Sequence, residues 1–151
     1  MKEKHAIISA RNPKISHQEI LQTAINGTDF ADLYRREVLT RQTRTLRLLG
    51  RKNSAKIIHT LLGFEVQACY KRIQCPDLVT ARYIRLFSEL GCNSIKLPYD
   101  PTRTAQVIPQ CEAMLDRVAD RIRALFPQDR QTQLYVFQKV FSIIRRQLRS
   151  A

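Results

Sequence analysis

The chain contains little glycine and no tryptophan. Its four glycines, Gly27, Gly50, Gly63 and Gly91, stand far apart, so the sequence lacks the glycine-rich loop that cradles nucleotide phosphates in many enzymes. The three histidines adjoin no serine, cysteine or carboxylate in a spacing typical of a catalytic pair. The sequence therefore predicts no catalytic residues, and we expect a protein that is not an enzyme.

Close cysteine pairs and long apolar runs are also missing. The four cysteines, at positions 69, 75, 92 and 111, form no C-x-x-C pair of the kind found in zinc and redox sites, so we expect neither a metal nor another cofactor. No apolar run approaches the roughly 20 residues of a membrane span, and the first residues do not resemble a signal peptide. We therefore expect a cytoplasmic protein with reduced thiols and no membrane partner.

Basic residues are abundant. The 151 residues include 26 Lys and Arg against 13 Asp and Glu, which gives a formal net charge of +13. An excess of this size indicates a polyanionic partner, with nucleic acid the first candidate. The length suits one domain, and the apolar content of 44% is enough for a buried core.

The densest basic stretch runs from residue 35 to residue 56. It contains eight Lys and Arg and a single acid, Glu37. Two stripes emerge when the surrounding residues are placed on helical spacing. The cationic stripe holds Arg36, Thr40, Thr43, Arg44 and Arg47, and the apolar stripe holds Phe30, Tyr34, Val38, Thr45 and Leu49. This pattern predicts an amphipathic helix with a core face and a cationic face.

Helix start and stop signals divide the chain into six predicted helices. A basic N-terminal arm, residues 1–15, is expected to precede a single α-helical domain, residues 16–151. The predicted helices cover about 16–26, 28–49, 54–73, 77–90, 102–126 and 130–148. A short extended segment is expected near 94–97, inside a candidate functional loop, 92–103, that carries Lys96, Tyr99 and Arg103. The predicted fold class is all-α, a bundle or orthogonal array of about five to six helices.

The residues expected to contact nucleic acid come from the basic stretch and from the last helix. They are Arg36, Thr40, Arg41, Arg44, Arg47, Arg51, Lys52, Lys56, Arg145, Arg146 and Arg149. Arginine outnumbers lysine, which favours planar, bidentate contacts with phosphate. Few aromatic side chains are expected at the surface, which favours backbone contacts over base stacking. We expect a subunit of a larger nucleoprotein assembly, with DNA and RNA both open.

Two other interpretations remain. The predicted helices 28–49 and 54–73 are also compatible with a helix-turn-helix. Alternatively, the protein is a helical adaptor whose basic face docks an acidic protein. Glu112, Asp116 and Asp120 are spaced by four residues on one helix face, and we regard them as a candidate contact with a protein partner or a second copy.

Overall fold

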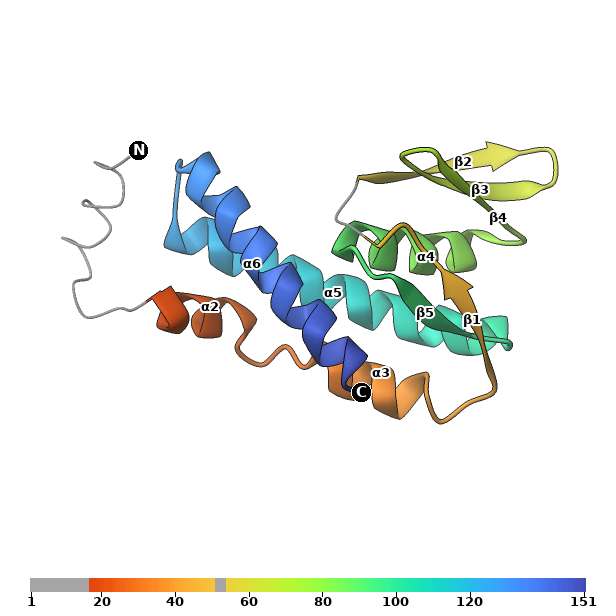
Figure 1. Cartoon of the computed structure of the whole chain (residues 1–151), viewed down its shortest axis with the longest axis horizontal. Helices are drawn as coiled ribbons and strands as arrows, with labels where there is room; N and C mark the ends of the chain where they lie inside the picture. The colour runs from red at the N-terminus through yellow and green to blue at the C-terminus, as the bar shows by residue number, and fades with distance from the viewer. Residues whose placement is uncertain (1–16, 51–53) are drawn as a thin grey trace.

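Strands lie within residues 43–47 and 55–75, where helices were predicted, so the all-α prediction is wrong and the protein has an α+β fold. The computed structural model describes residues 17–50 and 54–151, and the predicted arm, 1–15, lies outside them. The elements are α2 (His17–Ile25), α3 (Phe30–Glu37), β1 (Thr43–Arg47), β2 (Ala55–Thr60), β3 (Gly63–Ala68), β4 (Lys71–Cys75), α4 (Leu78–Leu90), β5 (Ser94–Pro98), α5 (Pro101–Leu125) and α6 (Arg130–Arg149). Figure 1 shows both sheets gathered at one end of the long helices α5 and α6.

The predicted helix over 28–49 ends early, at Glu37. Its N-cap is Asp29, whose carboxylate accepts the N–H of Asp32 at 2.9 Å. From residue 43 the sequence reads T-R-T-L-R-L, which is the two-residue alternation of a strand. This segment forms β1 and pairs antiparallel with β5. The predicted cationic stripe therefore does not exist, because neighbouring residues of a strand point to opposite faces.

The predicted helix over 54–73 is instead the antiparallel meander β2-β3-β4. Ile57, Val66 and Ile73 are paired across its three strands and belong to the core or pack against it. Other apolar residues of the stretch, such as Ile57, Leu61, Leu62 and Phe64, have a spacing that also fits a helix. The hairpin turns at 61–62 and 69–70 lack the Asn and Gly that usually mark such turns. With β1 and β2 as strands, the helix-turn-helix interpretation is also wrong.

The remaining elements agree with their sequence signals. The helices expected near 16–26, 77–90, 102–126 and 130–148 and the extended segment near 94–97 are all present. Gly91 ends α4 in a left-handed conformation, with φ of 85°. Pro109 lies inside α5 without ending it. It is exposed, and so is Ala105, whose carbonyl would have accepted the missing N–H, so water can take that place.

Helix α4 is the centre of the core. Tyr83, Ile84, Phe87 and Leu90 are almost completely buried. The helix contacts the meander on one side and α5 and α6 on the other, as Figure 1 shows for the meander. One continuous cluster of buried side chains joins residues from all the described helices and from both sheets.

Strand β5 has a free edge on the side away from β1. The N–H of Leu48 donates to the carbonyl of Asn93 at 2.8 Å, which makes this a hydrogen-bonded pair of the β1–β5 ladder. Hydrogen-bonded and non-hydrogen-bonded pairs alternate along an antiparallel ladder. The pair of Thr45 and Lys96, three positions further on, is therefore non-hydrogen-bonded, and the backbone groups of Lys96 point to the free edge.

Two buried tyrosines occupy this edge. The hydroxyl of Tyr34, from α3, accepts the N–H of Lys96 at 2.7 Å. The hydroxyl of Tyr83, from α4, donates to the carbonyl of Lys96, also at 2.7 Å. Burial raises the pKa of both tyrosines, so both stay protonated. Helices α3 and α4 are thereby hydrogen-bonded to the same residue of β5.

Replacing either tyrosine by phenylalanine tests this arrangement. Tyr83→Phe leaves the Lys96 carbonyl without its partner, and Tyr34→Phe does the same to the N–H. We expect each to lower the free energy of unfolding by roughly 1–3 kcal/mol, measured by urea denaturation. Tyr135→Phe, at an exposed tyrosine, is the control and should change it by less than about 0.5 kcal/mol. Parent-like stability of both buried variants would show that the edge bonds are dispensable.

Candidate functional site

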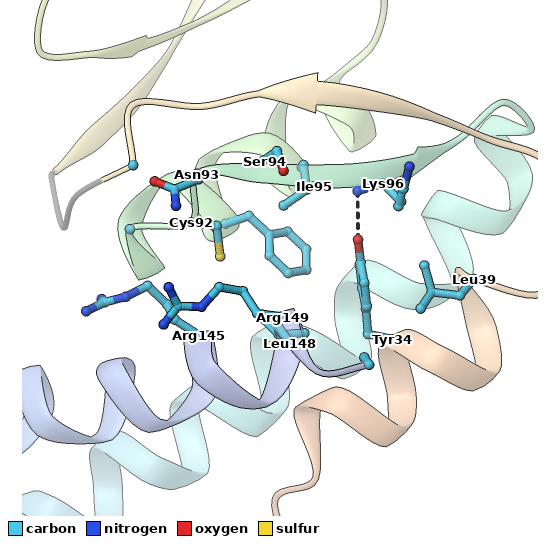
Figure 2. A pocket seen from close by; sticks show the side chains of 14 residues that line it. Tyr34, Leu39, Cys92, Asn93, Ser94, Ile95, Lys96, Arg145, Leu148 and Arg149 are labelled. Carbon is cyan, nitrogen blue, oxygen red and sulfur yellow. Dashed lines mark hydrogen bonds between the residues drawn. The ribbon is translucent and has the colours of Figure 1, made fainter.

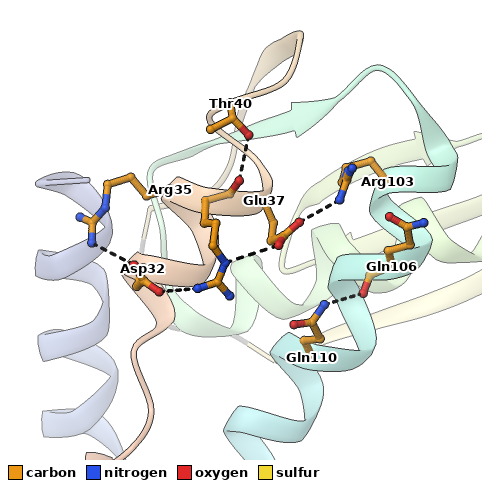
Figure 3. A network of polar contacts seen from close by, with 8 residues as sticks. Asp32, Arg35, Glu37, Thr40, Arg103, Gln106 and Gln110 are labelled. Atoms are coloured by element: carbon orange, nitrogen blue, oxygen red, sulfur yellow. Dashed lines mark hydrogen bonds and ion pairs between the residues drawn. The ribbon is translucent and has the colours of Figure 1, made fainter.

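Two of the predicted binding residues are engaged within the chain. The guanidinium of Arg36 lies 2.7 Å from a carboxylate oxygen of Asp32 and 3.4 Å from one of Glu37 (Figure 3). The hydroxyl of Thr40 donates to the carbonyl of Arg36 at 2.8 Å. Glu37 also pairs with Arg103 at 2.8 Å. The charges of Arg36 and Arg103 are thus largely balanced by carboxylates, which makes them poor candidates for binding an external anion.

The other basic residues of the 41–56 stretch do not form one stripe. Arg51 and Lys52 lie outside the described residues. Arg44 and Arg47 are both exposed but lie on opposite faces of β1. Burial raises the pKa of the Cys75 thiol and the charge of Arg44 opposes that rise, which places Arg44 on the side of the meander. The sequence prediction therefore combined residues that the fold separates.

One face of the two-stranded β1–β5 sheet is polar and turned to solvent. We call this the ribbon face. It comprises Thr43, Thr45, Arg47, Ser94 and Lys96 of the two strands, and we include the exposed Arg41, two residues before β1. The ammonium of Lys96 donates to the hydroxyl of Thr45 at 2.6 Å. Among the described residues, no carboxylate forms an ion pair with Arg41, Arg47 or Lys96. The face thus presents three unpaired cations and two threonine hydroxyls along roughly 20 Å of extended chain.

A cavity of about 370 Å³ adjoins one end of the ribbon face, where Arg47 pairs with Ser94. It lies between the start of β5, α3 and the end of α6 (Figure 2). Arg145 and Arg149 line one end of it, and Tyr34 and Leu39 line the other. Arg145 is fixed by donating to the carbonyl of Leu90 at 2.6 Å.

The pKa of the Cys92 thiol is affected by the positive charges that line this cavity. Burial raises its pKa to about 11, while the positive charges of Arg145 and Arg149 act in the opposite direction. Both guanidiniums are therefore close enough to influence a group in the cavity wall. Arg146, between them in the sequence, is exposed and does not line the cavity.

A smaller cavity of about 260 Å³ adjoins the opposite end of the ribbon face. It is lined by Arg41, Gln42, Tyr99, Asp100 and Arg103. Tyr99 is 64% exposed. Because Asp100 caps α5 here and Glu37 balances Arg103, this end is less positive than the cavity beside α6.

The predicted acidic contact surface is partly used inside the protein. Glu112 forms an ion pair with Arg82 of α4, and Asp120 lies 3.3 Å from Arg123. Asp116 is exposed on the same helix. Whether this surface meets a partner stays a prediction.

Lys56, from the same predicted set, lies elsewhere. It is exposed on the outer face of the meander, where its cross-strand partner is Gln67. It therefore does not extend the ribbon face. The predicted binding residues did not include Ser94 or Thr45. The T-R-T-L-R-L alternation was a sufficient signal for a strand with its threonines and Arg47 on one face, but it gives no signal for Ser94.

No protein-family model matches the chain, and no curated protein or solved structure is significantly similar to it. Within residues 17–50 and 54–151, no three His, Cys, Asp or Glu side chains are grouped so that they could hold a metal ion. None of the described helices has both the length and the apolar character to cross a bilayer. The function of the protein therefore has to be inferred from the cations and cavities of its α+β fold.

The four thiols provide a solution test of the packing around the cavity. Cys69 is exposed, whereas Cys75, Cys92 and Cys111 are buried, which raises their pKa values to about 11, 11 and 12. Reaction needs an accessible thiolate, so we expect one fast thiol at pH 8 and three that react only after unfolding. An aromatic disulfide reagent followed by absorbance measures this. Cys69→Ser should remove the fast phase, and a second fast thiol would contradict the packing.

Proposed function

We propose that the protein binds the sugar-phosphate backbone of a nucleic acid through the ribbon face. The observation that carries the proposal is the row of unpaired cations at one exposed face of the two-stranded sheet: Arg47 on β1, Lys96 on β5, and Arg41 just before β1. Cations that already have carboxylate partners gain little from a phosphate, whereas unpaired ones release counterions from the polyanion on binding. Threonines 43 and 45 add hydroxyl donors between them.

The C-terminal end of α6 extends this surface. Arg146 and Arg149 are exposed and form no ion pair within the described part of the chain. The cavity brings Arg149 beside the β5 end of the ribbon face. A strand that follows the ribbon face therefore meets further positive charge where β5 begins.

The proposed role is non-catalytic, as a subunit of a larger nucleoprotein assembly in the cytoplasm. The four cysteines are all free, which suits a reducing compartment. Of the exposed tyrosines, Tyr70 and Tyr135 lie on other elements, and Tyr99 follows β5 beside the end of the ribbon face. Contacts with phosphates are therefore expected to dominate over base stacking, with low sequence specificity.

Strand β1 supplies a matched pair of variants for testing this proposal. Arg47→Gln and Arg44→Gln remove the same charge from the same strand, but from opposite faces. We expect Arg47→Gln to weaken binding of a fluorescent single-stranded oligonucleotide by roughly three- to tenfold at low salt. It should also reduce the slope of log affinity against log salt by about one. Arg44→Gln should have a clearly smaller effect.

Fluorescence anisotropy at two salt concentrations, with DNA and RNA oligonucleotides of equal length, measures both quantities. Equal losses in the two variants would mean that net charge matters and the ribbon face does not. No affinity of the parent protein for either nucleic acid at low salt would overturn the proposal, and an acidic protein would then be the partner to seek.

A further inference from the structure

We propose that the cavity between β5, α3 and α6 binds the phosphomonoester group of a small organic ligand and holds the organic part against its apolar wall. A free nucleotide carries such a group, and so does the phosphorylated end of a nucleic-acid strand. The first source is independent of the function proposed above, whereas the second rests on it.

The anion-binding end of the cavity combines side-chain and backbone donors. Arg145 and Arg149 line it from α6, and Asn93 and Ser94 line it from the point where β5 begins. Ser94 pairs with Arg47, next to the hydrogen-bonded pair of Leu48 and Asn93. By the alternation of the ladder, the N–H of Ser94 points to the free edge of β5. No tyrosine hydroxyl occupies this position in the described structure, unlike at Lys96, so the N–H is available to a ligand.

The charges of this end favour a doubly charged group. Arg145 uses one N–H on the carbonyl of Leu90 and keeps others for a ligand. Arg149 makes no hydrogen bond or ion pair with the described part of the chain, so its whole guanidinium is available. Among the described residues, no aspartate or glutamate side chain lines the cavity. Two planar guanidiniums suit the oxygens of a phosphomonoester, which carries close to two negative charges at neutral pH.

The opposite end of the cavity is apolar. Because inorganic phosphate has no apolar part to contact this end, it is not the expected ligand. Tyr34 and Leu39 form the wall of this end, together with Leu148 (Figure 2). The cavity volume of about 370 Å³ lies at the lower end of the range of roughly 300–1,000 Å³ typical of small-molecule sites. A phosphate would fill only the arginine end, so the ligand is expected to have an organic part of modest size.

Adjacent arginines of α6 provide the test. Arg149 lines the cavity and Arg146 does not, yet both are exposed and neither holds another part of the fold. Arg145 is not used, because it holds the carbonyl of Leu90. The parent protein, Arg149→Gln and Arg146→Gln are each titrated with a nucleoside 5′-monophosphate, the corresponding nucleoside and inorganic phosphate. Amide ¹H–¹⁵N spectra report the site, and the dispersion of the same spectra reports that each variant is folded.

We expect saturable shifts of the amides of residues 91–96 with the nucleoside monophosphate. Arg149→Gln should weaken this binding by about ten- to a hundredfold, and Arg146→Gln by less than about twofold. Any of three results would overturn the site: no saturable shift at millimolar ligand, equal affinity for the nucleoside or for inorganic phosphate, or equal losses in the two variants.

A comparison of oligonucleotides identifies the source of the group. Strands of one sequence carrying a 5′-phosphate or a 5′-hydroxyl are bound to the parent and to Arg149→Gln. A preference for the phosphorylated strand that disappears in Arg149→Gln supports the strand end, and equal affinities support a free nucleotide as the ligand. Monophosphate binding in a protein without affinity for either strand would retain this site and reject backbone binding at the ribbon face.

Discussion

The backbone of Lys96 in β5 holds helices α3 and α4 against the β1–β5 sheet. Tyr34 brings α3 to its N–H, Tyr83 brings α4 to its carbonyl, and β1 pairs with the same strand on the other side. Unpaired strand edges invite pairing with other chains, and here two buried hydroxyls occupy the edge instead. Because these bonds are made with the backbone, the side chain of Lys96 stays on the solvent side. Lys96 thus holds the two tyrosines with its backbone and contributes its ammonium group to the proposed binding face.

The position of β5 also determines both features proposed to bind anions. Its pairing with β1 places Lys96 beside Thr45 and Ser94 beside Arg47, which creates the ribbon face. Its free edge runs towards α6, and the cavity lies where the tyrosines no longer cover that edge. The cations therefore come from segments far apart in the sequence. A purely helical arrangement of the basic stretch would have placed Arg44 and Arg47 on one surface and left Ser94 without a role.

The sequence was informative where helix signals were local and uninterrupted. The N-cap residue Asp77, Gly91 and the apolar spacing of 107–125 predicted α4 and most of α5, and Asn93 with Pro98 marked the extended segment. It was misleading over 55–75, because apolar residues of β2, β3 and β4 also fit a helical spacing. Leu61 and Leu62 occupy a hairpin turn that usually carries Asn or Gly, so no signal separated β2 from β3.

The candidate site was predictable only in part for the same reason. The positive charge and the choice of Arg47 and Arg149 as candidates follow from composition and position, but most contacts of the cations with distant residues do not. Neutralisation of Arg36 by Asp32 and Glu37 involves neighbours within one helix turn and was accessible from spacing. The cavity was not, because Arg149 and Ser94 meet only through tertiary packing.

The order in which the chain folds follows from the two hydroxyl bonds on β5. Tyr83 is 13 residues from Lys96, whereas Tyr34 is 62 residues away. The meander, α4 and β5 are contiguous in the chain, and the loops that join them are short, so their contacts close at small entropic cost. We infer that this central unit assembles first and that β1 and α3 join it late. The ribbon face, which needs β1, would then be completed only when the rest of the molecule is nearly native.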